Sequence, residues 1–301
     1  MIDLLVSIIG MAVPLLLCSM GTLFEEKAGT VNIGLEGLML TGALFGVLGS
    51  YWSGSPYIGT LIAMVAGLFM SLLFAFFTVT VHANQIVMGV AINTIATGLT
   101  VSLNRIFLTS NSVVKVNGFT SVPIPFLSDI PFIGPVLFRQ TIPGYFAYLL
   151  VILTWFVYTK TDLGLKIRAV GEHPTACDTV GINVVKLRYG TILYSGVLAG
   201  LAGAFIATGQ LSAFSEGMIS GRGFTAYAAV IFGNFTPLGV FRACMIFAVG
   251  MGLQYRLQAM DTPISFYFWI MLPYLITILA ICMYRKRSNT PKYSGVPYIK
   301  N

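Results

Sequence analysis

Long apolar stretches, separated by short polar ones, recur along the whole chain. Residues 60–81, TLIAMVAGLFMSLLFAFFTVTV, contain no charged side chain and no alternation of apolar and polar residues. A bilayer core of about 30 Å needs about 20 helical residues to cross it, whereas a membrane β-barrel needs alternating segments of about ten residues. Because backbone groups in lipid must bond within their own segment, these stretches predict transmembrane helices.

The pattern predicts an all-α polytopic membrane protein, a single transmembrane domain over residues 1–301 with about nine spans (8–10). The composition agrees, because 56% of the residues are hydrophobic and 9% are charged, against about a quarter charged in soluble domains. Residues 224–237 are short and contain glycine, so the count changes if they only dip into the membrane. The predicted spans are 3–23, 33–52, 57–81, 84–108, 143–160, 189–209, 224–237, 239–258 and 264–284.

Basic residues gather in two short segments that flank apolar runs. Five of the 17 Lys and Arg residues lie in 160–188 and five in the tail 285–301, and the net charge is +7. This placement indicates cytoplasmic loops and argues against a nucleic-acid partner. Five predicted crossings precede the first basic segment, which puts the N-terminus outside and the C-terminus inside. The first apolar run has no basic residue before it, so we expect it to be retained and not cleaved as a signal peptide.

The connections between the predicted spans include two long ones. Residues 109–142 form the longest extracytoplasmic loop and contain the proline-rich sequence VPIPFLSDIPFIGP. Residues 161–184 are too polar to cross a membrane, and TDLGLKIRAVGEHP predicts a short amphipathic helix capped by Thr161 or Asp162. An apolar ridge of Leu165, Ile167 and Val170 suits docking into a groove of a partner protein. A connector helix that lies on the membrane surface is the alternative.

Small residues share one face of the predicted span 189–209. Gly196 and Gly200 are four residues apart, and Gly203 is offset by three. This spacing lets another helix approach closely, which favours a role in helix packing without chemistry.

Polar side chains inside the apolar runs are candidates for a substrate path. Carboxylates in lipid cost at least about 2.5 kcal/mol, so Glu36 is expected to face protein or water, bonded to a helix end or to Lys27. Amides both donate and accept hydrogen bonds and suit a neutral polyhydroxy or nucleobase ligand. Hydrogen bonding between helices is the alternative for each residue. The candidates are Asn32, Glu36, Gln85, Asn93 and Asn234.

The chain lacks the motifs of an enzyme. It contains no GxxxxGK[ST] loop, no HExxH and no CxxC, and its two histidines, His82 and His173, have no triad setting. The four scattered cysteines have no metal-ligand spacing. No catalytic residue, metal or cofactor is predicted. Since Glu36 is nearly the only acid in the spans, active transport would take its energy from another subunit.

The order of the spans suggests an inverted repeat. Spans 1–4 and 6–9 run in opposite directions, and the second span of each group begins at an irregular stretch, GTVNIGLEG or SGRGFTAYA. Broken helices of such repeats often meet near the middle of the bilayer.

Four blocks of the sequence resemble one family in the expected order. GLKIRAVGEHPTACDTVGINVVKLR followed by YSGVLAGLAGAF resembles the cytoplasmic coupling region and next span of bacterial ABC-importer permeases of the branched-chain amino acid, ribose and nucleoside group. EEKAGTVNIGLEGLMLTGALFG, ANQIVMGVAINTIATGLT and SGRGFTAYAAVIFGNFTPLGV are similar to its other blocks. VNIGLEGLML and NQIVMGVAIN look most like permeases that work with basic-membrane-protein-type lipoproteins. Family members often have arginine at the position of Lys27 and alanine at that of Cys177.

The resemblance implies a multi-pass protein of the bacterial inner membrane that imports a nucleoside or a simple sugar. It implies three partners: an extracytoplasmic binding lipoprotein, a second permease in a heterodimer, and a cytoplasmic ATPase that holds the ATP and Mg²⁺. The resemblance identifies residues 161–188 as the segment that couples the permease to the ATPase. In this segment small residues would let the ATPase approach closely, Arg168 would contact the ATPase and Pro174 would set a bend. The expected coupling residues are Gly164, Arg168, Ala169, Gly171, Pro174, Ala176 and Gly181.

Two other functions remain open at the level of sequence. A stand-alone facilitator or secondary carrier for a small polar solute would need no docking surface on residues 161–184. A membrane scaffold would carry no solute at all. Co-purification with an ATPase separates the importer from the carrier.

Overall fold

The computed structural model describes residues 2–108, 115–128, 130–131, 133–258 and 289–299, with scattered positions between 268 and 278. The protein is mostly helical, and its one small sheet is the antiparallel pair β1 (Val122–Pro123) and β2 (Arg139–Gln140) among the described residues. The long helices are α1 (Ile2–Lys27), α2 (Leu35–Ser53), α3 (Pro56–Ala75), α4 (Gln85–Phe107), α6 (Ile142–Lys160), α9 (Val184–Ala204) and α11 (Pro237–Gln258). The shorter ones are α5 (Ile133–Leu137), α7 (Asp162–Glu172), α8 (Pro174–Thr179) and α10 (Arg222–Phe232), and π-helical turns extend α3 to Thr80 and α9 to Leu211.

Within the described part of the chain, six helices are long and apolar enough to cross a membrane. They are α1, α3 with its extension, α4, α6, α9 with its extension, and α11, and they overlap the predicted spans 3–23, 57–81, 84–108, 143–160, 189–209 and 239–258. The count of nine and the inverted repeat are not confirmed. The predicted span 264–284 lies outside the described residues, apart from scattered helical positions.

The predicted span 224–237 differs most from the structure. Helix α10 has 11 residues, which gives a rise of about 16 Å, roughly half of the bilayer core. It ends at Phe232, and α11 begins at Pro237 after a turn in which Asn234 and Phe235 have positive φ. The helix therefore does not cross by itself; it enters the bundle and turns back.

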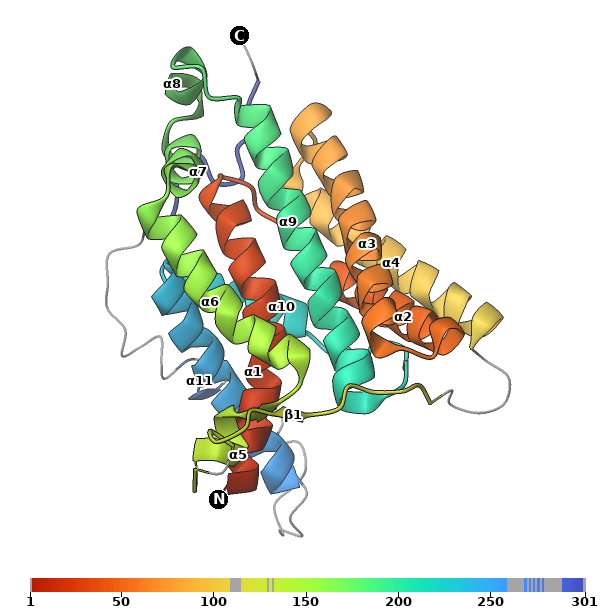
Figure 1. Cartoon of the computed structure of the whole chain (residues 1–301). Coiled ribbons are helices and arrows are strands. Elements are labelled where there is room, and N and C mark those ends of the chain that lie inside the picture. The colour runs from red at the N-terminus through yellow and green to blue at the C-terminus, as the bar shows by residue number, and fades with distance from the viewer. Residues whose placement is uncertain are drawn as a thin grey trace.

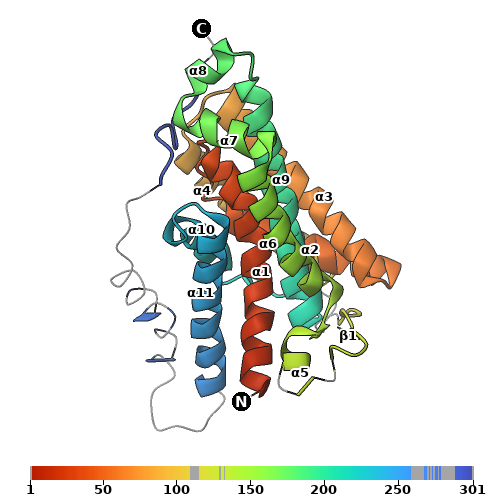
Figure 2. The ribbon, with the colours of Figure 1, turned by 60° about the vertical axis from the view of Figure 1, so that its left-hand side comes forward.

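Helix α1 lies at the centre of the bundle (Figure 2). It is apolar around its whole circumference, and nearly every residue from Ile8 to Lys27 is buried. A helix without a polar face has to be surrounded by other helices, and α1 packs against α6, α9, α10 and α11.

Helices α2, α3 and α9 approach one another at glycines. At Gly196 and Gly200 the space that a Cβ needs is filled by residues of α3, including Gly67 and Ala63, and at Gly203 by the carbonyl oxygen of Met39 in α2. A larger side chain at any of the three would push two backbones apart.

The two ends of the bundle carry different segments (Figure 1). The start of α1, the end of α11, α5 and the β1–β2 pair lie at one end. Helices α7 and α8 lie at the opposite end, together with residues 289–299. The predicted loop 109–142 and the predicted coupling segment 161–188 are therefore on opposite ends of the molecule; residues 109–114, 129 and 132 of the loop lie outside the described residues.

Candidate functional site

The two irregular stretches that the sequence singles out meet inside the bundle. The side chain of Glu36, in the first turn of α2, reaches the first residues of α10. One of its carboxylate oxygens accepts a hydrogen bond from the amide of Gly221 and the other from the amide of Gly223, both at 2.8 Å. A carboxylate at a helix N-terminus is stabilised by the unpaired N–H groups and by the helix dipole. We call this contact the α2–α10 junction.

The junction requires glycine. A Cβ at Gly223 would lie 2.5 Å from the backbone nitrogen of Glu36, a distance at which one backbone must move. Gly221 has a φ of +81°, which non-glycine residues adopt only with strain. Glu36 is thus bonded to a helix end, one of the two environments that the sequence suggests for it, and Lys27 is not its partner.

Three amide side chains hold the chain between α1 and α2. Gln85 accepts a hydrogen bond from the amide of Val31 at 2.7 Å. Asn93 accepts one from the amide of Gly37 at 2.8 Å and donates one to the carbonyl of Ile33 at 3.1 Å. Asn32 caps the turn by accepting a bond from Gly34. The segment that leads into α2 is therefore held from α4, at Gln85 and Asn93.

Four of the five predicted substrate-path residues come together around this segment, and Asn234 does not. Asn234 lies in the turn between α10 and α11, where its side-chain oxygen accepts a hydrogen bond from the amide of Asn289 at 2.8 Å. Glu36, Gln85 and Asn93 bond to backbone groups of neighbouring elements. This arrangement matches the alternative given in the sequence analysis, in which these side chains form hydrogen bonds between helices.

Two further buried acids were missed in the sequence. Glu25 and Glu26 are 0% and 1% exposed, so the prediction that Glu36 is nearly the only acid in the spans is wrong. The predicted span stopped at residue 23, whereas α1 continues to Lys27. Both carboxyl groups lie close to Asn32, Glu25 also to Ser195 of α9 and Glu26 to Tyr227 of α10. The sequence signal was the EEK triplet that follows directly on the apolar run.

The start of α10 has a second anchor, which the sequence analysis did not identify. Arg222 donates a hydrogen bond to the side-chain oxygen of Gln210 at 2.9 Å and another to the hydroxyl of Tyr255 at 3.3 Å. Gln210 in turn donates to the carbonyl of Gly10 in α1. The half-length helix is thereby attached to α1, α9 and α11 as well as to α2.

The predicted coupling segment forms two short helices. Thr161 is the cap of α7, since its hydroxyl accepts a hydrogen bond from the amide of Gly164. Of the predicted apolar ridge, Ile167 and Val170 are buried against the protein, whereas Leu165 is exposed. A groove of about 650 Å³ runs beside α7, between α6 and α9, and Gly181 is among its lining residues.

The seven predicted coupling residues divide by exposure. Ala176 and Gly181 are exposed, Arg168 and Ala169 are half-buried, and Gly164, Gly171 and Pro174 are buried. Gly164 lies against the carbonyl of Val157 and Gly171 against that of Lys27, so these two glycines permit internal packing. The guanidinium of Arg168 lies 4.9 Å from the ring centre of Tyr158, and its Nε donates to Gly164.

Residues 289–299 form a strap across the same end of the molecule. Their backbone bonds to the side chains of Lys27 and Arg188 and to the backbones of Gly29 and Gly171. Arg188, one of the five basic residues counted in 160–188, is buried and also donates to the carbonyl of Ala28 at 3.2 Å. The distances are Lys27 Nζ to Asn289 O 2.8 Å, Tyr293 N to Gly171 O 3.0 Å, Gly295 N to Gly29 O 3.1 Å and Arg188 Nη1 to Val296 O 2.9 Å.

Comparison with known proteins places the sequence of this chain among transport proteins. Residues 4–281 match the family described as "Branched-chain amino acid transport system / permease component". The guanosine ABC transporter permease protein NupQ of Bacillus subtilis (strain 168) is 39% identical over 299 residues, which cover 96% of this chain and 94% of the relative. The nucleoside ABC transporter permease protein NupC of Lactococcus lactis subsp. cremoris (strain MG1363) is 37% identical, with 96% and 94% covered. The guanosine ABC transporter permease protein NupP of Bacillus subtilis is 28% identical, with 84% and 72% covered. No solved structure matches the chain.

Proposed function

The chain belongs to the permease-component family of branched-chain amino acid transport systems, and from this premise we propose that it is the transmembrane permease subunit of an ATP-driven importer for nucleosides. Two relatives that match 94% of their own length are named as permeases for guanosine and for nucleosides. The chain is a non-catalytic transport subunit, and ATP is hydrolysed by a separate cytoplasmic partner.

One observation carries the mechanism: an unbroken series of contacts joins α7 to the α2–α10 junction. Gly171 of α7 lies against Lys27, at the end of α1. The segment that follows is bonded to the strap at Gly29 and to α4 through Gln85 and Asn93. It ends in α2, where Glu36 holds the start of α10. A displacement of α7 by the ATPase would therefore be passed to two helix ends inside the bundle.

The exposed residues of the coupling segment are the surface we assign to the ATPase. Ala176 and Gly181 are exposed, and both are small enough for close approach. Arg168 faces Tyr158 and acts in the packing of α7 on α6. In this arrangement α7, α8 and the strap lie in the cytoplasm, and the N-terminus and residues 109–142 lie outside, in reach of a substrate-binding lipoprotein.

A second, different permease chain completes the importer. Bacillus subtilis has two relatives of this chain, NupQ at 39% and NupP at 28% identity, and both are named as permeases of guanosine transport. The two relatives differ in their identity to this chain but are named for the same substrate, which supports an importer built from two different permease chains. This chain would take the position of NupQ, the more similar of the two.

The proposal is tested by reconstitution. Vesicles that contain this chain, its companion permease and the ATPase, with the lipoprotein outside and ATP inside, are expected to accumulate radiolabelled guanosine against its gradient. Vesicles that contain this chain alone are expected to accumulate none. Accumulation by the single chain without ATP would instead establish the stand-alone carrier.

A further inference from the structure

The groove beside α7 combines an apolar floor with a basic rim. Phe24 of α1, Val157 of α6 and Ile167 of α7 line it and belong to one cluster of packed apolar side chains. The ring of Phe24 packs edge-on against that of Tyr194 in α9, with 5.7 Å between the ring centres. The groove has a volume of about 650 Å³, within the range of about 300–1,000 Å³ that is usual for ligand sites.

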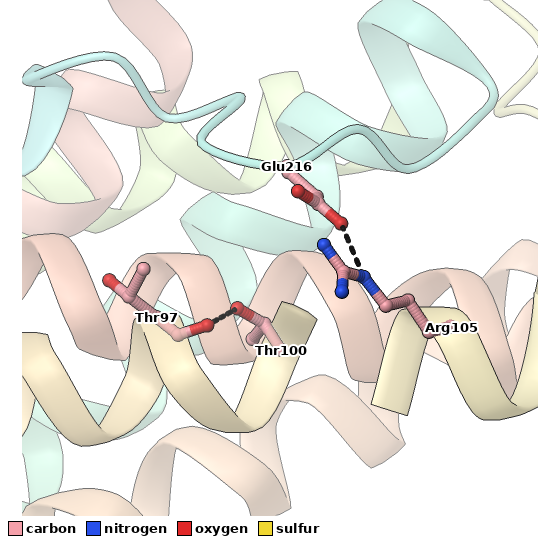
Figure 3. A network of polar contacts seen from close by, with 4 residues as sticks. All are labelled: Thr97, Thr100, Arg105 and Glu216. Carbon is pink, nitrogen blue, oxygen red and sulfur yellow. Dashed lines mark hydrogen bonds and ion pairs between the residues drawn. The ribbon is translucent and has the colours of Figure 1, made fainter. Parts of the chain in front are cut away.

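Two lysines from different helices form the basic rim. Lys166 belongs to α7 and Lys186 to the first turn of α9, and the lining residues of the groove include no acid. Lys166 pairs with the exposed Asp162 at 3.0 Å. Lys186 is exposed and has no ion pair within the described part of the chain, whereas Arg105 of α4 lies 3.8 Å from Glu216 (Figure 3). The rim therefore keeps a net positive charge.

The groove lies where the spans leave the hydrocarbon core. Helix α6 has 19 residues, which gives a length of about 28 Å, nearly that of the core. Its end at Lys160 is therefore at the membrane surface. Val157, three residues before that end, lines the groove, and Lys166 lies six residues beyond it. The apolar floor is thus at the depth of lipid tails, and the lysines are at the depth of the head groups.

The groove is open towards the flank of the bundle. Figure 1 shows the end of α1 between α6 and α9, close to α7. At the edge of the groove Leu163 is 54% and Tyr194 37% exposed. Leu153, one helical turn before Val157, is also exposed and continues the apolar surface along α6. An apolar chain in the groove can therefore extend into the bilayer without crossing a polar surface.

The polar groups of the lining are mostly used by the protein itself. The side-chain oxygen of Asn183 accepts a hydrogen bond from the amide of Lys186, and the hydroxyl of Thr191 donates to the carbonyl of Arg188. A nucleoside would find few partners here. Asn183 also marks the start of α9, and a helix N-terminus favours an anion. The groove thus suits a molecule with a long apolar tail and a negative head.

We propose that this groove is a binding site for an anionic phospholipid. One acyl chain lies on Phe24, Val157 and Tyr194. The phosphate binds to Lys166 and Lys186, as in other basic pockets between membrane helices. The site rests on the proposed orientation, which puts this lipid in the cytoplasmic leaflet, and on no particular transport substrate. Because the lipid touches α6, α7 and α9, it holds the coupling segment against the spans.

Native mass spectrometry of the purified full chain tests the head group. The chain is titrated with phosphatidylglycerol and, separately, with phosphatidylcholine of the same acyl chains. We expect phosphatidylglycerol to bind more tightly, and Lys166→Gln with Lys186→Gln to weaken its binding roughly tenfold while phosphatidylcholine is unaffected. Lys160→Gln is the matched control, because Lys160 is exposed at the end of α6 and does not line the groove.

A second variant tests the apolar floor. Gly190 lines the groove, and a Cβ there meets nothing within 4 Å, so Gly190→Phe puts a ring into the groove without displacing the backbone. Both lipids should bind this variant more weakly, while its midpoint of thermal unfolding without added lipid stays unchanged. Gly98→Phe, at an equally open position of α4, should bind both lipids as the unsubstituted chain does.

Four outcomes would overturn the proposal. Equal binding of the two lipids by the unsubstituted chain, or an unchanged preference in the double lysine variant, would remove the head-group assignment. Unchanged binding by Gly190→Phe would remove the acyl chain from the groove. Loss of bound phosphatidylglycerol on assembly with the companion permease and the ATPase would show that protein covers the groove. The masses are measured without transport, so each result is independent of guanosine uptake.

Discussion

Single residues in this protein act mainly through the backbones they touch. Glu36 uses both carboxylate oxygens on amides of α10, and the glycines of α9 leave room for carbonyl groups of other helices. Substitutions at such positions affect two elements at once, because the partner is main chain and cannot move aside alone. The first two predictions concern these residues.

Neutralising Glu36 should loosen the start of α10. In Glu36→Gln one acceptor oxygen becomes an NH₂ donor that faces a backbone N–H, so one buried hydrogen bond is lost at a cost of about 1–3 kcal/mol. We expect a lower midpoint of thermal unfolding in detergent and reduced guanosine uptake. Asp162→Asn is the control, because Asp162 is exposed and pairs with Lys166 at the surface. An unchanged midpoint for Glu36→Gln would contradict the role of the junction.

Enlarging Gly200 should separate α3 from α9. Gly200→Val places two methyl groups where Ala63 and Gly67 lie, and overpacking of this kind costs roughly 1–3 kcal/mol. The variant is expected to unfold at lower temperature and to elute from a sizing column as aggregate. Gly190→Val, ten residues earlier on the same helix, has open space around it and should behave as the unsubstituted protein. Equal behaviour of the two variants would argue against tight packing at Gly200.

At the scale of elements, α7 and the strap form one packed layer over the end of α1. Val170, Cys177, Val184 and Tyr298 share an apolar cluster, so the strap contributes to the core under the coupling helices. Docking of an ATPase and stability of this layer are separate properties, and different residues test them.

Docking should be tested at Ala176 and not at Gly171. Ala176→Arg adds bulk and charge to an exposed position of α8, so co-purification with the ATPase and uptake should be lost while the unfolding temperature stays unchanged. Gly171→Arg would collide with the backbone of Lys27 and is expected to lower that temperature as well. Retention of the ATPase by Ala176→Arg would remove α8 from the docking surface.

The strap should depend on Arg188. Arg188→Met removes the donor to the carbonyls of Ala28 and Val296. The carbonyl of Ala28 is buried, so its loss of this partner costs roughly 1–3 kcal/mol. The expected result is a lower unfolding temperature and faster proteolysis of residues 289–301. Lys186→Met, on an exposed position of the same helix, is the matched control. Equal proteolysis in the two variants would show that Arg188 does not hold the strap.

The whole molecule has a densely packed centre and exposed outer faces. Helix α1 is enclosed, whereas α3, α4 and α6 present exposed residues outward. In a heterodimer, one of these outer faces contacts the companion permease.

The companion permease should be necessary for assembly. Co-expression of this chain with the ATPase alone is expected to yield no importer that hydrolyses ATP in response to the loaded lipoprotein, and addition of the companion should restore it. The measurement is lipoprotein-stimulated ATPase activity of the purified complex. Full activity without the companion would indicate a homodimer.

What the sequence determined by itself is the class of protein and the position of most long helices. A run of about 20 apolar residues is a local property of the chain. In lipid such a segment forms a helix, because a helix satisfies all backbone hydrogen bonds within the segment. The six described spans therefore agree with predicted ones, and the family blocks, which are contiguous in sequence, were recognisable before any fold was known.

Only the tertiary structure decided what the polar residues contact. Asn32, Glu36, Gln85 and Asn93 come together and Asn234 does not, and Glu25, Glu26 and Arg188 are buried. Each of these facts depends on a partner that lies elsewhere in the sequence, up to 187 residues away for Glu36 and Gly223. Hydropathy measures transfer of a residue from water to lipid; it contains no information on which backbone groups the folded bundle leaves free to bond.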